Sequence, residues 1–153
     1  MRLTLLTILM IAPRLFAQNG ANCQQAGGAI LTNFLDPSTT LGSATGDFKG
    51  GIAVTVLTAA PGPNGSTVFH NQHRWVTESG DTIALAEADA TASPAQAGAV
   101  SAIVYVKGVQ VTGGTGRFAG ASGSLAIFGA INGEGQLVLR YQGQVCFKPV
   151  PAH

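Results

Sequence analysis

The sequence predicts an all-β protein: a closed antiparallel β-barrel of about eight strands, arranged as a meander and held by one disulfide. Three observations carry this prediction. Apolar and β-branched runs are separated by glycine, proline and asparagine, charged residues are few (10%), and stretches with helical periodicity are absent. Because the connections are short, successive strands should pair, and closure removes the exposed edges of such a meander.

Seven runs carry the strand pattern, and the run at 47–59 is long enough to form two strands split at Lys49-Gly50-Gly51. Turn-forming residues separate the runs, as in Asp36-Pro37, Ser79-Gly80 and Asn132-Gly133. The seven predicted strands are 29–35, 47–59, 66–77, 81–92, 99–111, 124–132 and 136–147.

The first 17 residues are predicted to be a signal peptide rather than part of the barrel. Arg2 gives a positive start, an apolar run of ten follows at 3–12, and the small Ala17 ends the segment. A run this short does not span a membrane. We therefore expect export, secreted or periplasmic, and a single barrel domain at 18–153 with no membrane span in the mature chain.

The charge of the mature chain argues against nucleic acid as a partner. The whole chain has 8 Lys and Arg against 7 Asp and Glu, and loss of Arg2 and Arg14 leaves 6 against 7, a net charge near −1. No cluster of basic residues stands out in the sequence, and nucleic-acid binding normally needs one.

Cys23 and Cys146 are the two cysteines, and they lie at opposite ends of the predicted barrel domain. In an oxidising compartment an even pair is typical of a disulfide. In the chain-entropy model, closing so long a loop stabilises by about 4–5 kcal/mol. A metal pair or a redox pair is the alternative, but neither cysteine has a histidine beside it and there is no CxxC motif. We expect no bound metal and no cofactor.

A glycine-rich segment, 111–125, reads VTGGTGRFAGASGSL. Its G-x-G-x-x-A pattern, from Gly114 to Ala119, superficially matches a dinucleotide fingerprint, but that fingerprint must open a helix and a strand follows here. The segment instead predicts a compact turn, in which glycines adopt positive φ and Phe118 folds back over the core.

The stretch GGTGRFAGASGSL resembles the signature turn of the allene oxide cyclase and dirigent-like β-barrel superfamily. With the predicted leader, the chain would be a secreted, bacterial-type member. The resemblance implies an eight-stranded barrel with a largely apolar interior, in which plant members cyclise a fatty-acid epoxide or steer the coupling of phenoxy radicals. No functional residue carries over from those members. The turn motif consists of Gly113, Gly114, Gly116, Phe118, Gly120 and Gly123.

The predicted strand 66–77 suggests a ligand site, because one of its faces carries two aromatic and two polar side chains. We expect this face to point inward, since its opposite, with His70 and Arg74, has little apolar bulk. Glu87, in the neighbouring run, and Tyr141 are added as residues that could present polar groups to the interior. The candidate ligand-binding residues are Phe69, Asn71, His73, Trp75, Glu87 and Tyr141.

Other chemistry has weaker support. His70 and His73 are three positions apart on a strand and face opposite sides, which counts against a shared metal. Glu87 and Asp89 share a face and could act as an acid and base pair, or could be solvated at a strand end. Catalytic residues cannot be assigned.

Three functions stay open. The first is binding of a small apolar molecule, lipid-like or phenolic, in the barrel interior. The second is an isomerase or cyclase that steers a reactive lipid or phenolic intermediate. The third is a structural or interaction protein with a filled barrel and no ligand. The sequence does not decide the oligomeric state.

Overall fold

A computed structural model describes residues 22–95 and 98–149 of the chain. Within them the protein is all-β, with three single-turn 3-10 helices, η1 (Gly46–Phe48), η2 (Pro63–Gly65) and η3 (Gly116–Phe118). The strands are β1 (Asn22–Asp36), β2 (Thr39–Ala44), β3 (Gly50–Pro61), β4 (Thr67–Thr77), β5 (Thr82–Leu85), β6 (Ala88–Pro94), β7 (Val100–Gly114), β8 (Ser122–Asn132) and β9 (Gln136–Phe147).

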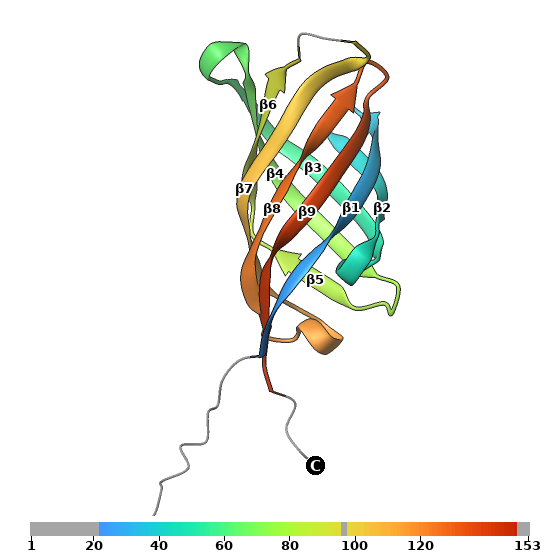
Figure 1. The fold of residues 1–153 in the computed structure, drawn as a ribbon, viewed down its shortest axis with the longest axis vertical. Helices are drawn as coiled ribbons and strands as arrows, with labels where there is room; N and C mark the ends of the chain where they lie inside the picture. The colour runs from blue at the N-terminus through green and yellow to red at the C-terminus, as the bar shows by residue number, and fades with distance from the viewer. Residues whose placement is uncertain (1–21, 96–97, 150–153) are drawn as a thin grey trace, which may run out of the picture.

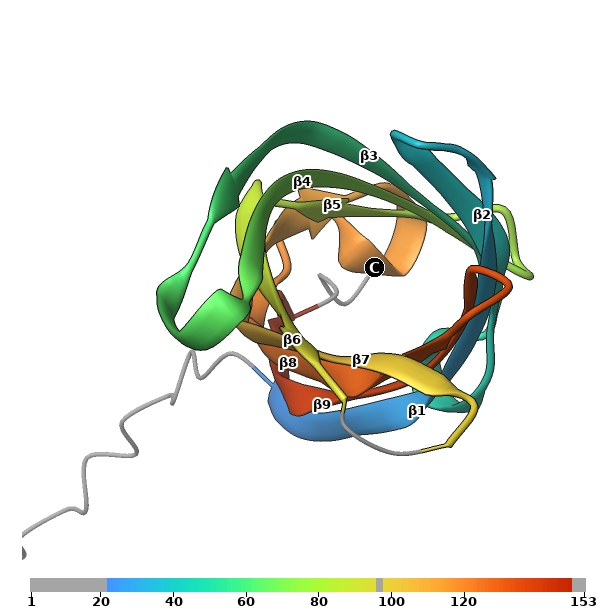
Figure 2. The ribbon, with the colours of Figure 1, turned by 90° about the horizontal axis from the view of Figure 1, so that it is seen from above.

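The strands close into a barrel (Figure 2). Every pairing is antiparallel, and the first strand pairs with the last along a ladder from Asn22 opposite Phe147 to Asn33 opposite Gln136. Both β5 and β6 lie between β4 and β7, so together they fill one position in an eight-position barrel. The predicted closed antiparallel meander is confirmed.

The eighth position is filled differently from the prediction. Residues 47–59 do not form two strands: Gly46–Phe48 is a 3-10 turn, and one strand, β3, begins at Gly50. The additional strand is β2, whose sequence TTLGSA pairs with both β1 and β3. Thr39 and Thr40 favour a strand, but the Gly-Ser-Ala that ends β2 interrupts the strand signal, so tertiary pairing decides its conformation.

A bulge separates β5 from β6. Arg74 of β4 lies opposite Ala84, and Asn71 lies opposite Ala88. The segment from β5 to β6 therefore has one more residue than β4 over this stretch. One extra residue reverses the alternation of faces. Residues before and after the bulge therefore face opposite sides: Ile83 is buried, whereas Glu87 and Asp89 are exposed.

The predicted disulfide is confirmed. Cys23 and Cys146 are bonded and lie directly opposite each other in the β1–β9 ladder. The bond therefore fastens the seam at which the first and last strands close the barrel. The bond lies at the end of the barrel where β1 begins and β9 ends (Figure 1).

Four aromatic side chains close this same end, and we call them the aromatic floor: Phe48, Trp75, Phe118 and Tyr141. The Trp75 Nε1–H donates to the Phe48 carbonyl at 2.8 Å. The Tyr141 hydroxyl accepts from the Phe48 N–H and donates to the Thr45 carbonyl, each at 2.8 Å. The polar atoms of these rings are thus satisfied inside a closed end.

The glycine-rich segment forms the compact turn that its sequence predicts. It contains η3, and Phe118 is fully buried in the floor. Gly114 has φ of +150° and Gly116 has φ of +52°, a region that glycine adopts without a Cβ penalty. The Arg117 side chain extends from the turn and lies over the Phe118 ring. Its Nη2 donates a hydrogen bond to the Asp47 carbonyl at 2.8 Å.

Candidate functional site

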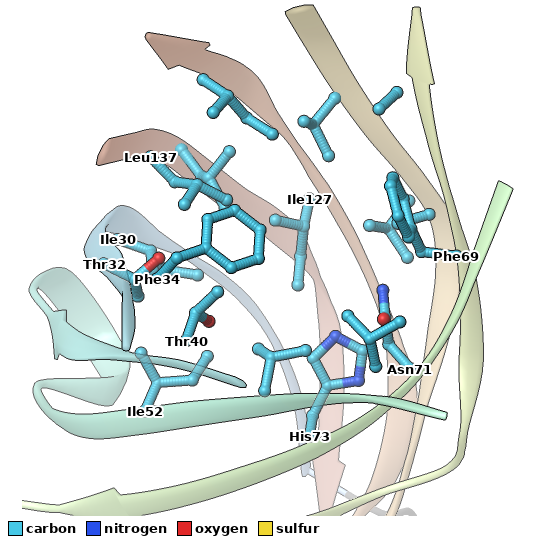
Figure 3. Close-up of a pocket in the computed structure, with 18 residues that line it drawn as sticks. Ile30, Thr32, Phe34, Thr40, Ile52, Phe69, Asn71, His73, Ile127 and Leu137 are labelled. Atoms are coloured by element: carbon cyan, nitrogen blue, oxygen red, sulfur yellow. The ribbon is translucent and has the colours of Figure 1, made fainter. Parts of the chain in front are cut away.

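Above the aromatic floor the barrel encloses a cavity of about 80 Å³ (Figure 3). Among the described residues, the eighteen that line it include fourteen apolar ones, four polar ones and none that carries a full charge at neutral pH. The polar residues are Thr32, Thr40, Asn71 and His73, and the apolar ones are Ile30, Phe34, Ile52, Val54, Val56, Phe69, Ala90, Ala92, Val104, Val106, Ile127, Ile131, Leu137 and Leu139.

The polar residues occupy only one half of the wall. Thr32 comes from β1, Thr40 from β2, and Asn71 with His73 from β4, whereas the lining of β6 to β9 is entirely aliphatic. Pairing explains part of this grouping, because Thr40 and His73 lie on either side of Val54 in neighbouring strands. A molecule in the cavity would therefore meet polar groups on one side and hydrocarbon on the other.

Strand alternation places Phe69, Asn71 and His73 in the cavity wall. Consecutive inward positions on β4 are Phe69, Asn71, His73 and Trp75, and the last three are buried. Trp75 lies beyond the cavity, in the aromatic floor, where its N–H already has a partner. The inward face predicted for this strand is the one that the structure shows.

Two of the predicted site residues lie elsewhere. Glu87 is on the outer surface, because the bulge between β5 and β6 turns it outward, and its prediction as a cavity residue is wrong. Tyr141 is buried in the aromatic floor rather than in the cavity lining, with its hydroxyl engaged by backbone groups. Burial raises the pKa of the Tyr141 phenol.

Three cavity side chains have a buried polar atom with no hydrogen-bond partner in the part of the chain that the structure describes. They are Thr32 Oγ1, Asn71 Oδ1 and His73 Nδ1. The three residues are between 3% and 7% exposed. A buried polar group without a partner costs about 1–3 kcal/mol, so native proteins normally supply one. All three atoms belong to residues of the same cavity wall.

His73 is uncharged at neutral pH. Its burial lowers the pKa of the imidazole from 6.5 to about 4, because the apolar surroundings disfavour the charged ring. A neutral imidazole has one N–H donor and one nitrogen acceptor, so it can hydrogen-bond to a ligand in either sense. His73 can therefore position a polar group without bringing a positive charge into the cavity.

Thr32 and Thr40 were not predicted as site residues. Thr32 could have been found from the alternation of Ile30, Thr32 and Phe34 within the predicted strand 29–35, which puts it on the apolar face. Thr40 had no such signal, because it belongs to the strand that was missed. Phe34 lines the cavity yet is 38% exposed, which places it at the mouth, opposite the floor.

A second polar cluster lies outside the barrel at the β5–β6 bulge. His70 Nδ1 is 2.8 Å from Asp89 Oδ1, and His70 Nε2 is 3.0 Å from Glu87 Oε2. Hydrogen bonds to Asp89 and then Glu87 raise the pKa of the His70 imidazole, because both carboxylates favour the ring with two N–H groups. Lys107 and Tyr105 border the same surface hollow.

Residues 22–95 and 98–149 contain no group of three or more His, Cys, Asp or Glu side chains placed to hold a metal ion. In the same ranges, no helix has the length and apolar character needed to cross a membrane.

Comparison with solved structures found two matches of low similarity. The pterocarpan synthase dirigent protein PsPTS1 is 13% identical, with a TM-score of 0.36, over 84% of this chain and 97% of that one. The pterocarpan synthase dirigent protein GePTS1 is 12% identical, with a TM-score of 0.36, over 93% and 98%. Similarities at this level carry no argument about function. No protein-family model and no curated protein matches the chain.

Proposed function

We propose that this protein binds a small, mainly apolar molecule, lipid-like or phenolic, inside its barrel. One observation carries the proposal: three buried polar atoms without partners line one otherwise apolar cavity. Ligand sites typically combine apolar walls with a few polar groups in fixed positions. Here three of the polar groups have no hydrogen-bond partner among the described residues. A bound molecule would supply their hydrogen bonds and cover the aliphatic half of the wall.

The size of the cavity restricts the ligand. A volume of about 80 Å³ is below the usual range of roughly 300–1,000 Å³ for small-molecule sites. The ligand should therefore be slender, such as a single alkyl chain or one narrow ring, with its remainder passing Phe34 at the mouth. The same small volume favours the second candidate function, a barrel filled by its own side chains and ordered water, which binds no ligand.

Extraction of the natively purified protein, followed by mass spectrometry, tests the proposal directly. We expect a small organic molecule at close to one per chain. Ala92→Leu should abolish this co-purification, because Ala92 lines the cavity and the larger side chain would occupy it. Ala84→Leu is the matched control, since Ala84 lies exposed on the outer side of β5. Extracts of wild-type protein that contain no such molecule would favour the filled barrel.

Export behind the leader at 1–17 is also part of our proposal, although the leader lies outside the described residues. The Cys23–Cys146 disulfide supports it, because disulfides persist mainly in oxidising compartments. The intact mass of protein recovered from outside the cytoplasm should correspond to a chain that begins near Gln18. Recovery of the full-length chain from the cytoplasm, with both thiols free, would contradict this.

A further inference from the structure

The uncharged state of the cavity restricts which polar group a ligand can bring into it. Among the described residues, no Lys, Arg, Asp or Glu lines the cavity. Moving an ion out of water into such surroundings is very unfavourable without an opposite charge beside it. A carboxylate would find no cation here, and an ammonium group would find no anion.

The two polar residues of β4 are placed to share one ligand group. Asn71 and His73 are two positions apart on one strand, so their side chains project from the same face about 7 Å apart at the backbone. Figure 3 shows both on the same side of the cavity. Asn71 Oδ1 accepts hydrogen bonds only, whereas a neutral imidazole nitrogen either accepts or donates. A ligand group that can both donate and accept would therefore suit the pair.

Hydroxyl is the simplest uncharged group with both capacities. Its hydrogen can be donated to Asn71 Oδ1 while its oxygen accepts from His73. We propose that the cavity selects an uncharged, hydroxyl-bearing ligand over a carboxylate or an amine, and that Asn71 and His73 determine this specificity. The inference rests on the proposed function, since it assumes that the cavity binds a ligand at all.

Burial of His73 is consistent with this selection. Desolvation holds the pKa of its imidazole near 4, so the ring gives no countercharge to an anionic ligand at neutral pH. Thr32, on β1 of the same polar half, offers a third unpartnered polar atom, its hydroxyl oxygen. It would accommodate a further polar atom of the ligand or an ordered water.

Isothermal titration calorimetry at neutral pH, with four slender ligands of similar length, tests the proposal. The ligands are octanol, its isosteric ether heptyl methyl ether, octanoate and octylammonium. We expect octanol to bind about tenfold more tightly than the ether, because the ether cannot donate to Asn71. Octanoate and octylammonium should bind more weakly than the ether.

Variants separate the role of the Asn71 and His73 side chains from nonspecific hydrophobic binding. Asn71→Leu and His73→Leu should each bring octanol close to the affinity of the ether, with the ether's own affinity kept or improved. His70→Ala is the matched control, because His70 lies on the opposite face of the same strand. It should leave the preference for octanol unchanged.

The failures of the two proposals can be told apart. Octanoate or the ether binding as tightly as octanol would overturn the inference while the binding function stands. A preference for octanol that survives both Asn71→Leu and His73→Leu would also overturn it. Absence of binding by all four ligands, together with extracts that contain no small molecule, would overturn the binding function and the inference with it.

Discussion

Thr32 is buried in an apolar wall, and its hydroxyl oxygen has no partner in the described part of the chain. Valine has nearly the same shape and no polar atom to desolvate. We expect Thr32→Val to stabilise the ligand-free protein by about 1 kcal/mol, measured by urea denaturation. Thr112→Val is a control, because Thr112 is exposed and its hydroxyl donates to the Ala84 carbonyl. A loss of stability in Thr32→Val would show that its hydroxyl is already hydrogen-bonded, for example to an ordered water.

The burial of His73 should make the stability of the protein sensitive to acid. The pKa of His73 is about 4 in the folded protein and 6.5 in the unfolded chain, so the unfolded chain binds the proton first as the pH falls. Stability should be unaffected above about pH 6.5 and should decrease towards pH 4, in total by on the order of 3 kcal/mol. Denaturation across this range should show the decrease in the wild type and a smaller one in His73→Leu. Equal slopes for the two proteins would contradict the burial of an uncharged ring.

The residues of the site were only partly predictable. Alternation along one strand was enough to identify Phe69, Asn71 and His73 as inward-facing, because a strand has a period of two. It could not place Trp75 and Tyr141 in the floor rather than in the cavity wall, since depth along the barrel axis depends on which turns close its end. Thr40 could not be predicted as a site residue, because the strand that contains it was not recognised.

At the scale of elements, the bulge between β5 and β6 decides which side chains face water. A strictly alternating strand over 81–92 would place Glu87 inside, and a single extra residue opposite β4 puts it outside, beside His70. The sequence carries little sign of this bulge, because Ala86 and Ala88 are equally compatible with either face. The missed β2 is also explained by its sequence: it is short, and its second half, Gly42 to Ala44, has little strand preference of its own.

The outer cluster at that bulge predicts a pH dependence opposite to that of His73. Asp89 and Glu87 raise the pKa of His70, so its contribution should be fully present below about pH 6.5 and lost as the pH rises through the folded value. Lys107 and Tyr105 also border this hollow, and His70→Gln leaves both in place. In thermal unfolding at pH values rising from about 6.5, the wild type should progressively lose its advantage over His70→Gln. An advantage that stays constant over that range would contradict the hydrogen bonds from His70 to Asp89 and Glu87.

The glycine-rich turn offers a graded test of backbone constraint. A Cβ on Gly114 would collide with the Thr82 carbonyl and lie 2.8 Å from the Phe118 Cβ, and its φ is +150°. We expect Gly114→Ala to lower the free energy of unfolding by about 1–3 kcal/mol or more, measured by chemical denaturation. Gly116→Ala should cost less, because it meets the movable Asp81 carboxylate.

Gly51→Ala is the matched control for these substitutions, since no atom lies within 4 Å of the Cβ it would add. Its stability should equal or slightly exceed that of the wild type. If Gly114→Ala were as stable as Gly51→Ala, the close approach of the turn to β5 would be disproved.

At the scale of the whole molecule, closure depends on the seam between β1 and β9. The Cys23–Cys146 bond fastens one end of that seam, while backbone pairing holds the rest. Replacing both cysteines with alanine should therefore leave the barrel folded but less stable, by about 2–4 kcal/mol in guanidinium denaturation. Dithiothreitol should reduce the stability of the wild type by a similar amount and leave the double variant unchanged. Equal midpoints for oxidised and reduced wild type would show that the bond adds nothing to closure.

The fold class was predictable because it depends on features repeated along the whole chain. Short connections and strand-like runs between turn residues recur from Ala29 to Phe147, and a single missed strand does not change the closure they imply. The cavity was not predictable in the same way. Its volume depends on how completely the inward side chains of all the strands fill the interior, and no local pattern encodes that.

The adjacency of Asn22 and Phe147 has a practical consequence for engineering this protein. Because the two ends of the barrel chain leave side by side beneath the floor, a short peptide could join them, and the chain could be cut instead at the Asp36–Ser38 turn beside the mouth. Such a circular permutant would carry its new termini next to the entrance of the cavity. A reporter group fused there would stand beside any molecule that enters, whereas a group attached beside Asn22 or Phe147 would lie at the opposite end of the barrel.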